Sequence, residues 1–321
     1  MSELDSSPEG AAFAVSGEEQ ISAADLVARR GALAGISTVR VRLEARGAGR
    51  LPALWTTALH GTLFAALREL SCFEPERGSC AGCGHLGDCS YAALAEPPGD
   101  PDKGEGVTDR APPALVLAPE SADFSTTSFE LARGDGIAAL LTLIGARAIE
   151  HRSLLVGALN RAAARMHGGT AGREGFLRLA SVDPIESEPT AAPQRARLTF
   201  VTPVRLKSQG RIQSELDAEV LWRSLARRAD SLARLYGAGP LAWDPAATAP
   251  FTLETLKSRV VSVQRFSNRQ KASMTWPGVL ATCLLAGDSL ASAWPLLHFG
   301  AQVQVGKATS FGFGRYRLEQ A

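Results

Sequence analysis

The stretch Val305-Gly306-Lys307-Ala308-Thr309-Ser310-Phe311-Gly312-Phe313-Gly314-Arg315-Tyr316 stands near the end of the 321-residue chain. It combines three glycines, two cations and three aromatic residues. Glycine permits backbone conformations and close approaches that other residues forbid, and backbone N–H groups clustered beside cations can hold a phosphate. The stretch therefore predicts either a loop that binds phosphate with Lys307 and Arg315, or a tight turn between two strands with a solvated cation on each side.

Composition predicts a globular protein of about two domains. Hydrophobic residues make up 45% of the chain and charged residues 21%, which suits cores of ordinary size. No apolar run approaches the roughly 18 residues that span a bilayer, and the acidic N-terminus lacks the order of a signal peptide. We expect a cytoplasmic protein with no membrane partner.

Charge divides the chain into two parts near Gln194. The whole chain carries a formal charge of +1, but residues 1–194 hold 17 basic and 25 acidic residues, whereas residues 195–321 hold 17 basic and 8 acidic residues. The C-terminal part is therefore the candidate for binding an anionic partner.

The N-terminal part reads as a mixed α+β domain. We expect residues 1–35 to form a partly mobile leader. Alternating apolar residues predict a strand at residues 36–46, and apolar residues at helical spacing predict a helix at 54–70 that contains His60. Further patterns predict helices at 135–148 and 154–166 and a strand at 176–182. The order suits a sheet that is covered on one side by helices.

Four of the five cysteines fall in the pattern Cys72-x7-Cys80-x2-Cys83-x5-Cys89, among several glycines. A Cys-x-x-Cys turn lets two thiolates reach one tetrahedral ion, and this predicts a structural zinc site, with His85 able to replace one cysteine. A structural role is favoured because four protein ligands leave no open position for water. A redox pair and free thiols in a loop are the alternatives.

The C-terminal part shows the element order of a ferredoxin-like domain. The patterns predict a strand at 195–200, a long helix at 215–236, extended segments at 253–266 and 274–285, a helix at 289–302 that is interrupted by Pro295, and a closing strand. Strand, helix, strand, strand, helix, strand is the ferredoxin-like order.

Three segments of this part carry a resemblance to a known family. Residues Thr202-Pro203-Val204-Arg205-Leu206-Lys207, then Arg265-Phe266-Ser267-Asn268-Arg269-Gln270-Lys271, then the glycine-rich stretch resemble the CRISPR-associated endoribonucleases that process precursor guide RNA. These enzymes belong to the RAMP superfamily. The resemblance implies an α+β fold of two tandem ferredoxin-like (RRM-like) domains. They would be an N-terminal domain over residues 36–190 with a Cys-rich insertion, and a basic RNA-binding domain over residues 195–321.

The resemblance also implies an activity. It is cleavage within CRISPR repeats without a catalytic metal, by attack of a 2′-hydroxyl on phosphorus, which leaves a 2′,3′-cyclic phosphate and a 5′-hydroxyl. Such a reaction needs groups that move protons and cations that offset the developing charge. Leu59-His60-Gly61-Thr62-Leu63 is similar to the setting of the catalytic histidine in several branches of the family, so His60 is the catalytic candidate. The other histidines remain open as alternatives: His85, His151, His167 and His298.

Cations at even spacing are the candidates for RNA binding. Arg265, Arg269 and Lys271 would point to one face of a strand, and Arg205 and Lys207 also share a face. The glycine-rich loop adds Lys307 and Arg315. These residues would grip phosphates, and the alternative is a solvated sheet edge.

Two other classes of protein stay open at this point. One is a noncatalytic RAMP-type subunit that holds guide RNA in an effector complex with other CRISPR subunits. The other is a nucleic-acid enzyme that uses zinc at the cysteine site.

Overall fold

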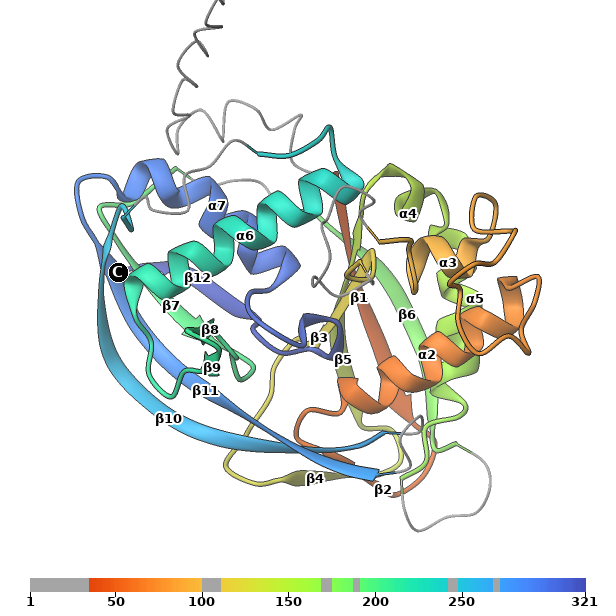
Figure 1. Cartoon of the computed structure of the whole chain (residues 1–321). Helices are drawn as coiled ribbons and strands as arrows, with labels where there is room; N and C mark the ends of the chain where they lie inside the picture. Colours follow the sequence, from red (N-terminus) through yellow and green to blue (C-terminus); the bar gives the residue numbers. More distant parts are fainter. Residues whose placement is uncertain (1–34, 100–110, 169–174, 187–190, 242–247, 268–271) are drawn as a thin grey trace, which may run out of the picture.

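The computed structural model describes residues 35–99, 111–168, 175–186, 191–241, 248–267 and 272–321 (Figure 1). The expected leader at residues 1–35 lies almost wholly outside this part of the chain. The described residues form two four-stranded antiparallel sheets with helices packed against them, and two small two-stranded sheets. Among them, no helix combines the length and the apolar composition needed to cross a membrane.

The first sheet has the strand order β3-β5-β1-β6. Its strands are β1 (Ile36–Ala45), β3 (Leu115–Pro119), β5 (Gly136–Ile144) and β6 (Leu177–Ile185). Alternate residues of β1, namely Val39, Val41 and Leu43, are buried beneath α2 (Thr56–Ser71) and α5 (Arg152–Ala163). Shorter elements complete the domain: β2 (Gly49–Pro52), which pairs with β4 (Ser128–Leu131), and the helices α3 (Ser90–Leu94) and α4 (Ala146–Glu150).

The second sheet repeats this arrangement, with the order β10-β11-β7-β12. Its strands are β7 (Arg195–Phe200), β10 (Thr252–Ser267), β11 (Ala272–Ala286) and β12 (Tyr316–Gln320), and its helices are α6 (Ala218–Tyr236) and α7 (Leu290–Val303). A small hairpin of β8 (Lys207–Ser208) and β9 (Arg211–Ile212) and a 3-10 turn, η1 (Thr309–Phe311), complete it. In both sheets the second and third strands lie on one side of the first strand and the fourth lies on the other, which is the ferredoxin-like topology. The predicted fold class, α+β with two tandem ferredoxin-like domains, is confirmed.

The hairpin of β10 and β11 is much longer than the strands beside it. The two strands have 16 and 15 residues, and the hairpin reaches from the second sheet towards β2 and β4 of the first domain (Figure 1). There Val263 of β10 packs in a small cluster with Leu54, which precedes α2, and Phe313 of the glycine-rich stretch. The hairpin thus ties the second domain to the beginning of α2.

The helix predicted at residues 135–148 is wrong. This segment forms β5 and then the short helix α4. β5 is an inner strand, with Leu141 opposite Val39 of β1 on one side and Leu117 of β3 on the other. A strand that is buried on an inner position carries a nearly continuous apolar run, and its spacing also fits a helix.

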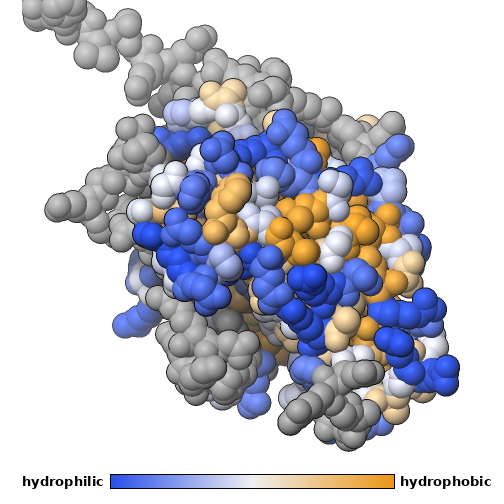
Figure 2. Space-filling model, turned by 90° about the vertical axis from the view of Figure 1, so that its right-hand side faces the viewer, coloured by the Kyte–Doolittle hydropathy of each residue, from blue (hydrophilic) through white to orange (hydrophobic). Residues whose placement is uncertain are grey.

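The side of the molecule that carries α2, α3 and α5 exposes apolar side chains among charged ones. Figure 2, which is viewed from this side, shows hydrophobic surface between hydrophilic residues. Exposed large hydrophobic residues of these elements and their loops are Leu70, Phe73 and Val156.

Candidate functional site

The glycine-rich loop is held tightly against the rest of the second domain. Gly314 and Lys307 donate backbone hydrogen bonds of 2.9 Å to the carbonyls of Pro203 and Arg205. Gly314 has a φ of +77°, and a Cβ there would lie 1.9 Å from the carbonyl oxygen of Val305, so only glycine fits. The loop is therefore a built part of the domain rather than a free turn.

Most backbone N–H groups of this loop already have partners inside the protein. Seven N–H groups between Val305 and Arg315 donate to protein oxygens, the last of them to Thr202 Oγ1 at 2.9 Å. Such groups cannot also hold a phosphate without losing their bonds. The amide cradle predicted from the glycine pattern is therefore largely used for packing, and side chains are left to bind an anion.

Arg315, predicted to contact RNA, lies instead in the junction of the two domains. It is 7% exposed, and Nη1 donates to the carbonyls of Pro119 and Glu120 at 3.0 and 2.6 Å. Burial lowers the pKa of its guanidinium to about 10, which leaves it protonated at neutral pH. Arg315 therefore fastens the loop to the end of β3, because both of its acceptors belong to the first domain.

Arg205, also predicted to contact RNA, is packed among aromatic rings. Its guanidinium lies 5.0 Å from the ring centre of Trp276 and 5.8 Å from that of Phe313, and Nε donates to the carbonyl of Pro277 at 2.9 Å. Burial lowers the pKa of this side chain. Contacts of this kind hold a guanidinium in one orientation and leave it only partly exposed.

The other residues predicted to bind RNA differ in where the structure places them. Lys307 and Lys207 are exposed, on the glycine-rich loop and on β8. Arg265 belongs to β10, opposite Met274 of β11, and the structure does not describe its side chain. Arg269 and Lys271 lie outside the described residues.

His60 lies on α2 where that helix meets the glycine-rich loop. Its ring is stacked on Phe64 with 4.0 Å between ring centres, and it contacts Phe311 of the loop at 4.2 Å. The side chain is half-buried, with exposed Gly61 next to it. The helical spacing explains this position, because Leu59 and Leu63 on the adjoining face of α2 are fully buried in the core.

Aromatic contacts connect His60 to the long hairpin. Phe311 lies 5.4 Å from Trp276 of β11, and Trp276 lies 5.9 Å from Phe313. The imidazole therefore stands at a point where α2, the glycine-rich loop and the hairpin converge. Sequence reasoning identified His60 and the loop separately, but spacing along the chain could not show that they touch.

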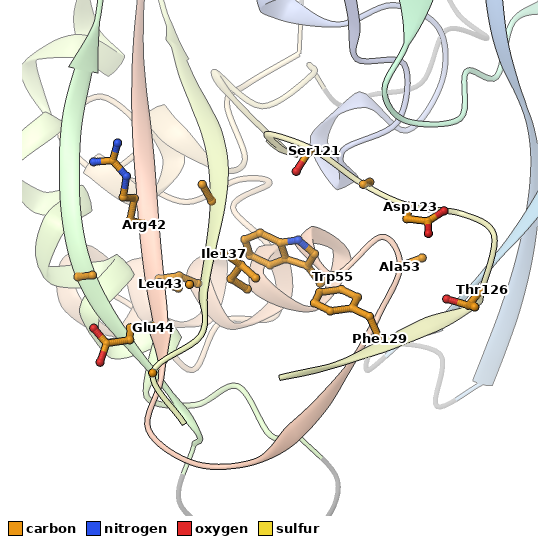
Figure 3. A pocket seen from close by; sticks show the side chains of 15 residues that line it. Arg42, Leu43, Glu44, Ala53, Trp55, Ser121, Asp123, Thr126, Phe129 and Ile137 are labelled. Atoms are coloured by element: carbon orange, nitrogen blue, oxygen red, sulfur yellow. The ribbon is translucent and has the colours of Figure 1, made fainter. Parts of the chain in front are cut away.

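Two pockets lie on either side of the segment Ser121, Ala122 and Asp123. The N-terminal pocket has a volume of about 900 Å³ and lies against the first sheet, and the rings of Trp55 and Phe129 line it (Figure 3). The C-terminal pocket, about 310 Å³, lies against the second sheet. Described cations that line the C-terminal pocket are Lys257, Arg259 and Arg317.

The two pockets differ in charge. Arg42 of the N-terminal pocket forms an ion pair with Asp183, and Glu44 forms one with Arg178. The C-terminal pocket has three cations and one acidic residue, Asp123, among its described lining residues. An anionic chain is therefore favoured on the side of the second sheet. Sequence reasoning missed these cations, although Lys257 and Arg259 have the spacing that places side chains on one face of a strand.

The four clustered cysteines surround one small cavity between α2 and α3. Cys72, Cys80, Cys83 and Cys89 all line it, and each is a free thiol. Burial and nearby negative charge raise the pKa of the Cys80 thiol to about 11. Within the described part of the chain, no three His, Cys, Asp or Glu side chains are grouped closely enough to hold a metal ion as they stand.

Two tandem ferredoxin-like domains, joined through a glycine-rich loop, make up the described part of the chain. Residues 33–202 match the family model AF_1859_N, described as an N-terminal domain, and residues 198–316 match the model for the CRISPR-associated endoribonuclease Cas6. The chain belongs to the Cas6-type family of CRISPR-associated proteins.

Solved structures of Cas6 proteins share this fold. Cas6 (TTHB231) from Thermus thermophilus, in a product complex, is 16% identical with a TM-score of 0.53, and the match covers 89% of this chain and 100% of that one. A Cas6-related protein from Pyrococcus furiosus is 12% identical with a TM-score of 0.51, covering 89% and 99%. The comparison with curated protein sequences finds no match.

Proposed function

We propose that this protein is an endoribonuclease that cleaves within CRISPR repeats of precursor guide RNA, with His60 as a catalytic group. One observation carries this proposal. His60 is half-buried rather than enclosed in the core, and it lies against Phe311 of the glycine-rich loop, where elements of both domains meet. Membership of the Cas6-type family supports repeat RNA as the substrate.

The proposed chemistry needs no catalytic metal. The 2′-hydroxyl next to the scissile bond attacks the phosphorus, and the products are a 2′,3′-cyclic phosphate and a 5′-hydroxyl. A histidine can take the 2′ proton or protonate the leaving oxygen, because its ordinary pKa lies near neutral pH. The rings of Phe64 and Phe311 would hold the imidazole of His60 in one orientation.

The RNA backbone would follow the cations that the structure leaves accessible. Lys307 is exposed on the loop beside Phe311, and Lys257, Arg259 and Arg317 line the C-terminal pocket. Contacts of this kind hold phosphates and carry little base information. The protein would meet this RNA in the cytoplasm. Other subunits of a CRISPR effector complex are proposed as further partners.

A noncatalytic RNA-binding subunit is the second candidate. The observation that favours it is the stacking of His60 between two aromatic rings, which packing alone can explain. A His60 variant that still binds RNA but no longer cleaves it is the result that separates the two functions.

The test is cleavage of a labelled CRISPR repeat RNA from the same source, in EDTA, with binding measured in parallel. The variants are His60→Ala and His298→Ala. His298 is a matched control, because it is also a half-buried helical histidine, stacked edge-on with Trp294 at 4.7 Å. We expect the wild type and His298→Ala to cut at one site, and His60→Ala to bind without cutting.

Three other outcomes would change the proposal. Tight binding by the wild type without cleavage would make the protein a binding subunit. Equal cleavage by both variants would remove His60 from the mechanism. Activity only after a divalent ion is added would overturn the metal-independent chemistry.

A further inference from the structure

We propose that Cys72, Cys80, Cys83 and Cys89 bind one zinc ion, which fastens the end of α2 to the start of α3. This site is separate from the proposed cleavage site and does not depend on it. All four sulfur-bearing side chains line a single cavity of about 10 Å³. A cavity of that size is at the lower limit for holding even one water molecule.

The backbone between Cys80 and Cys83 has the form of a metal-binding knuckle. The N–H of Cys83 donates to the carbonyl of Cys80 at 3.1 Å, and Gly82 has a φ of +66°. Arg77 braces this turn, because its Nη2 donates to the carbonyls of Ala81 and Gly82 at 3.1 Å each. The turn is therefore built without help from a bound ion, and both of its cysteines line the same cavity.

The other two cysteines lie at helix ends. Cys72 is the C-terminal cap of α2, and Cys89 is the N-terminal cap of α3. The thiol of Cys89 points to the carbonyl of Ser71 at 3.7 Å. Rotation about the Cα–Cβ bond to another staggered conformer would redirect this sulfur, and side-chain rotation of this kind is what the four thiols need to reach one ion.

A cation beside the cavity supports the choice of ligands. Four thiolates around Zn²⁺ carry a net charge of −2, which needs a positive neighbour in a partly buried site. Arg68 lines the same cavity, and its Nε is buried without a hydrogen-bond partner. Metal-bound thiolate is an acceptor for such an N–H group, and neighbours of this kind orient and stabilise metal ligands.

The remaining candidate ligand, His85, has other contacts. Its Nε2 lies 3.6 Å from a carboxylate oxygen of Glu74, and its ring packs on Phe73 at 5.1 Å. The cysteines are therefore the better ligand set. Four soft thiolates exclude magnesium and calcium, which take oxygen ligands, and four cysteines are an established ligand set of structural zinc.

The experiment measures metal in the full-length protein purified under reducing conditions. We expect one zinc ion per chain by elemental mass spectrometry. A cobalt-exchanged sample should show the d–d absorption of tetrahedral thiolate coordination. The variant Cys80→Ser/Cys83→Ser should lose both signals, whereas Cys283→Ser, which removes a buried cysteine from the second sheet, should keep them.

Two results would overturn the proposal. One is a wild-type protein that contains no zinc and gives no thiolate-type spectrum after cobalt is added to its reduced form. The other is an intact mass two hydrogens below that of the reduced chain, located to Cys80 and Cys83, since this would identify a disulfide pair. Both are read on the wild type, so the test holds even where the double variant does not fold. Cleavage of RNA is not needed for either measurement.

Discussion

Replacing Arg315 with methionine tests whether this residue joins the domains rather than binding RNA. Methionine keeps much of the length of the side chain but removes the donors to the Pro119 and Glu120 carbonyls. A hydrogen bond from a charged donor contributes about 1.5–3 kcal/mol, and the cost of burying the guanidinium offsets part of that gain. We expect Arg315→Met to lose about 3 kcal/mol of the free energy of unfolding.

Arg317→Met is the matched control. Arg317 is exposed and donates a single hydrogen bond, of 2.7 Å, to the same Glu120 carbonyl. Its replacement should cost at most about 1 kcal/mol. The two variants are compared by urea unfolding followed through tryptophan fluorescence, with the midpoint and the slope of each transition recorded. Two separate transitions in Arg315→Met would show that the domains have come apart.

RNA binding gives an independent test of whether Arg315 joins the domains rather than contacting RNA. Because Arg315 is buried, the salt dependence of repeat RNA affinity should be unchanged in Arg315→Met, whereas Lys307→Ala should flatten it. Arg315 does not have the role of joining the domains if Arg315→Met is no less stable than Arg317→Met, or if Arg315→Met flattens the salt dependence as Lys307→Ala does.

Further predictions concern the loop, one ion pair and the C-terminal pocket. Gly314→Ala should abolish ordered packing of the loop and cost at least about 2 kcal/mol, whereas Gly157→Ala, in open space on α5, should stabilise by up to about 1 kcal/mol in thermal unfolding. Arg40 forms an ion pair with the Glu120 carboxylate at 2.7 Å, and its side-chain hydrogen bond lowers the pKa of Glu120. The stabilisation from this pair therefore exists above the ordinary value of 4.5 and is lost as acid protonates the carboxylate. Glu120→Gln should therefore lower the melting temperature most at neutral pH and converge with the wild type in acid; a constant difference would contradict this. Replacing Lys257 and Arg259 with alanine should reduce the salt slope of RNA affinity by about 0.7 for each phosphate that the protein no longer neutralises, and an unchanged slope would remove the pocket from the RNA path.

Local pattern predicted most of the fold because each domain is built from segments with clear periodicity. The predicted helix at 54–70 and the strand at 195–200 correspond to α2 and β7. Among the described residues, only the segment at 135–148 failed as an element type, since apolar residues on an inner strand have no polar face to reveal a period of two.

The burial and the contacts of individual arginines could not be predicted from local pattern in the same way. Arg205 and Arg315 stand in motifs that look suited to phosphate, yet the first is stacked on rings and the second is bonded to carbonyls of the other domain. Burial depends on segments far away in the chain, and no local pattern reports it. Lys257 and Arg259 were missed for the converse reason, because a pair of cations on a strand is ordinary until a pocket forms beside it.

The position of α2 connects the two sites of the protein. Its first residue, Thr56, lies so close to the glycine-rich loop that a Cβ at Gly312 would come within 2.5 Å of its hydroxyl oxygen. Its last turn leads directly into Cys72 and the proposed zinc site. His60 lies between these two ends. A catalytic group must be held within a fraction of an ångström of its working geometry, and a rigid helix fixed at both ends meets this requirement better than a loop. The loop and the cysteine cluster therefore act on one element, although more than 200 residues separate them in the sequence.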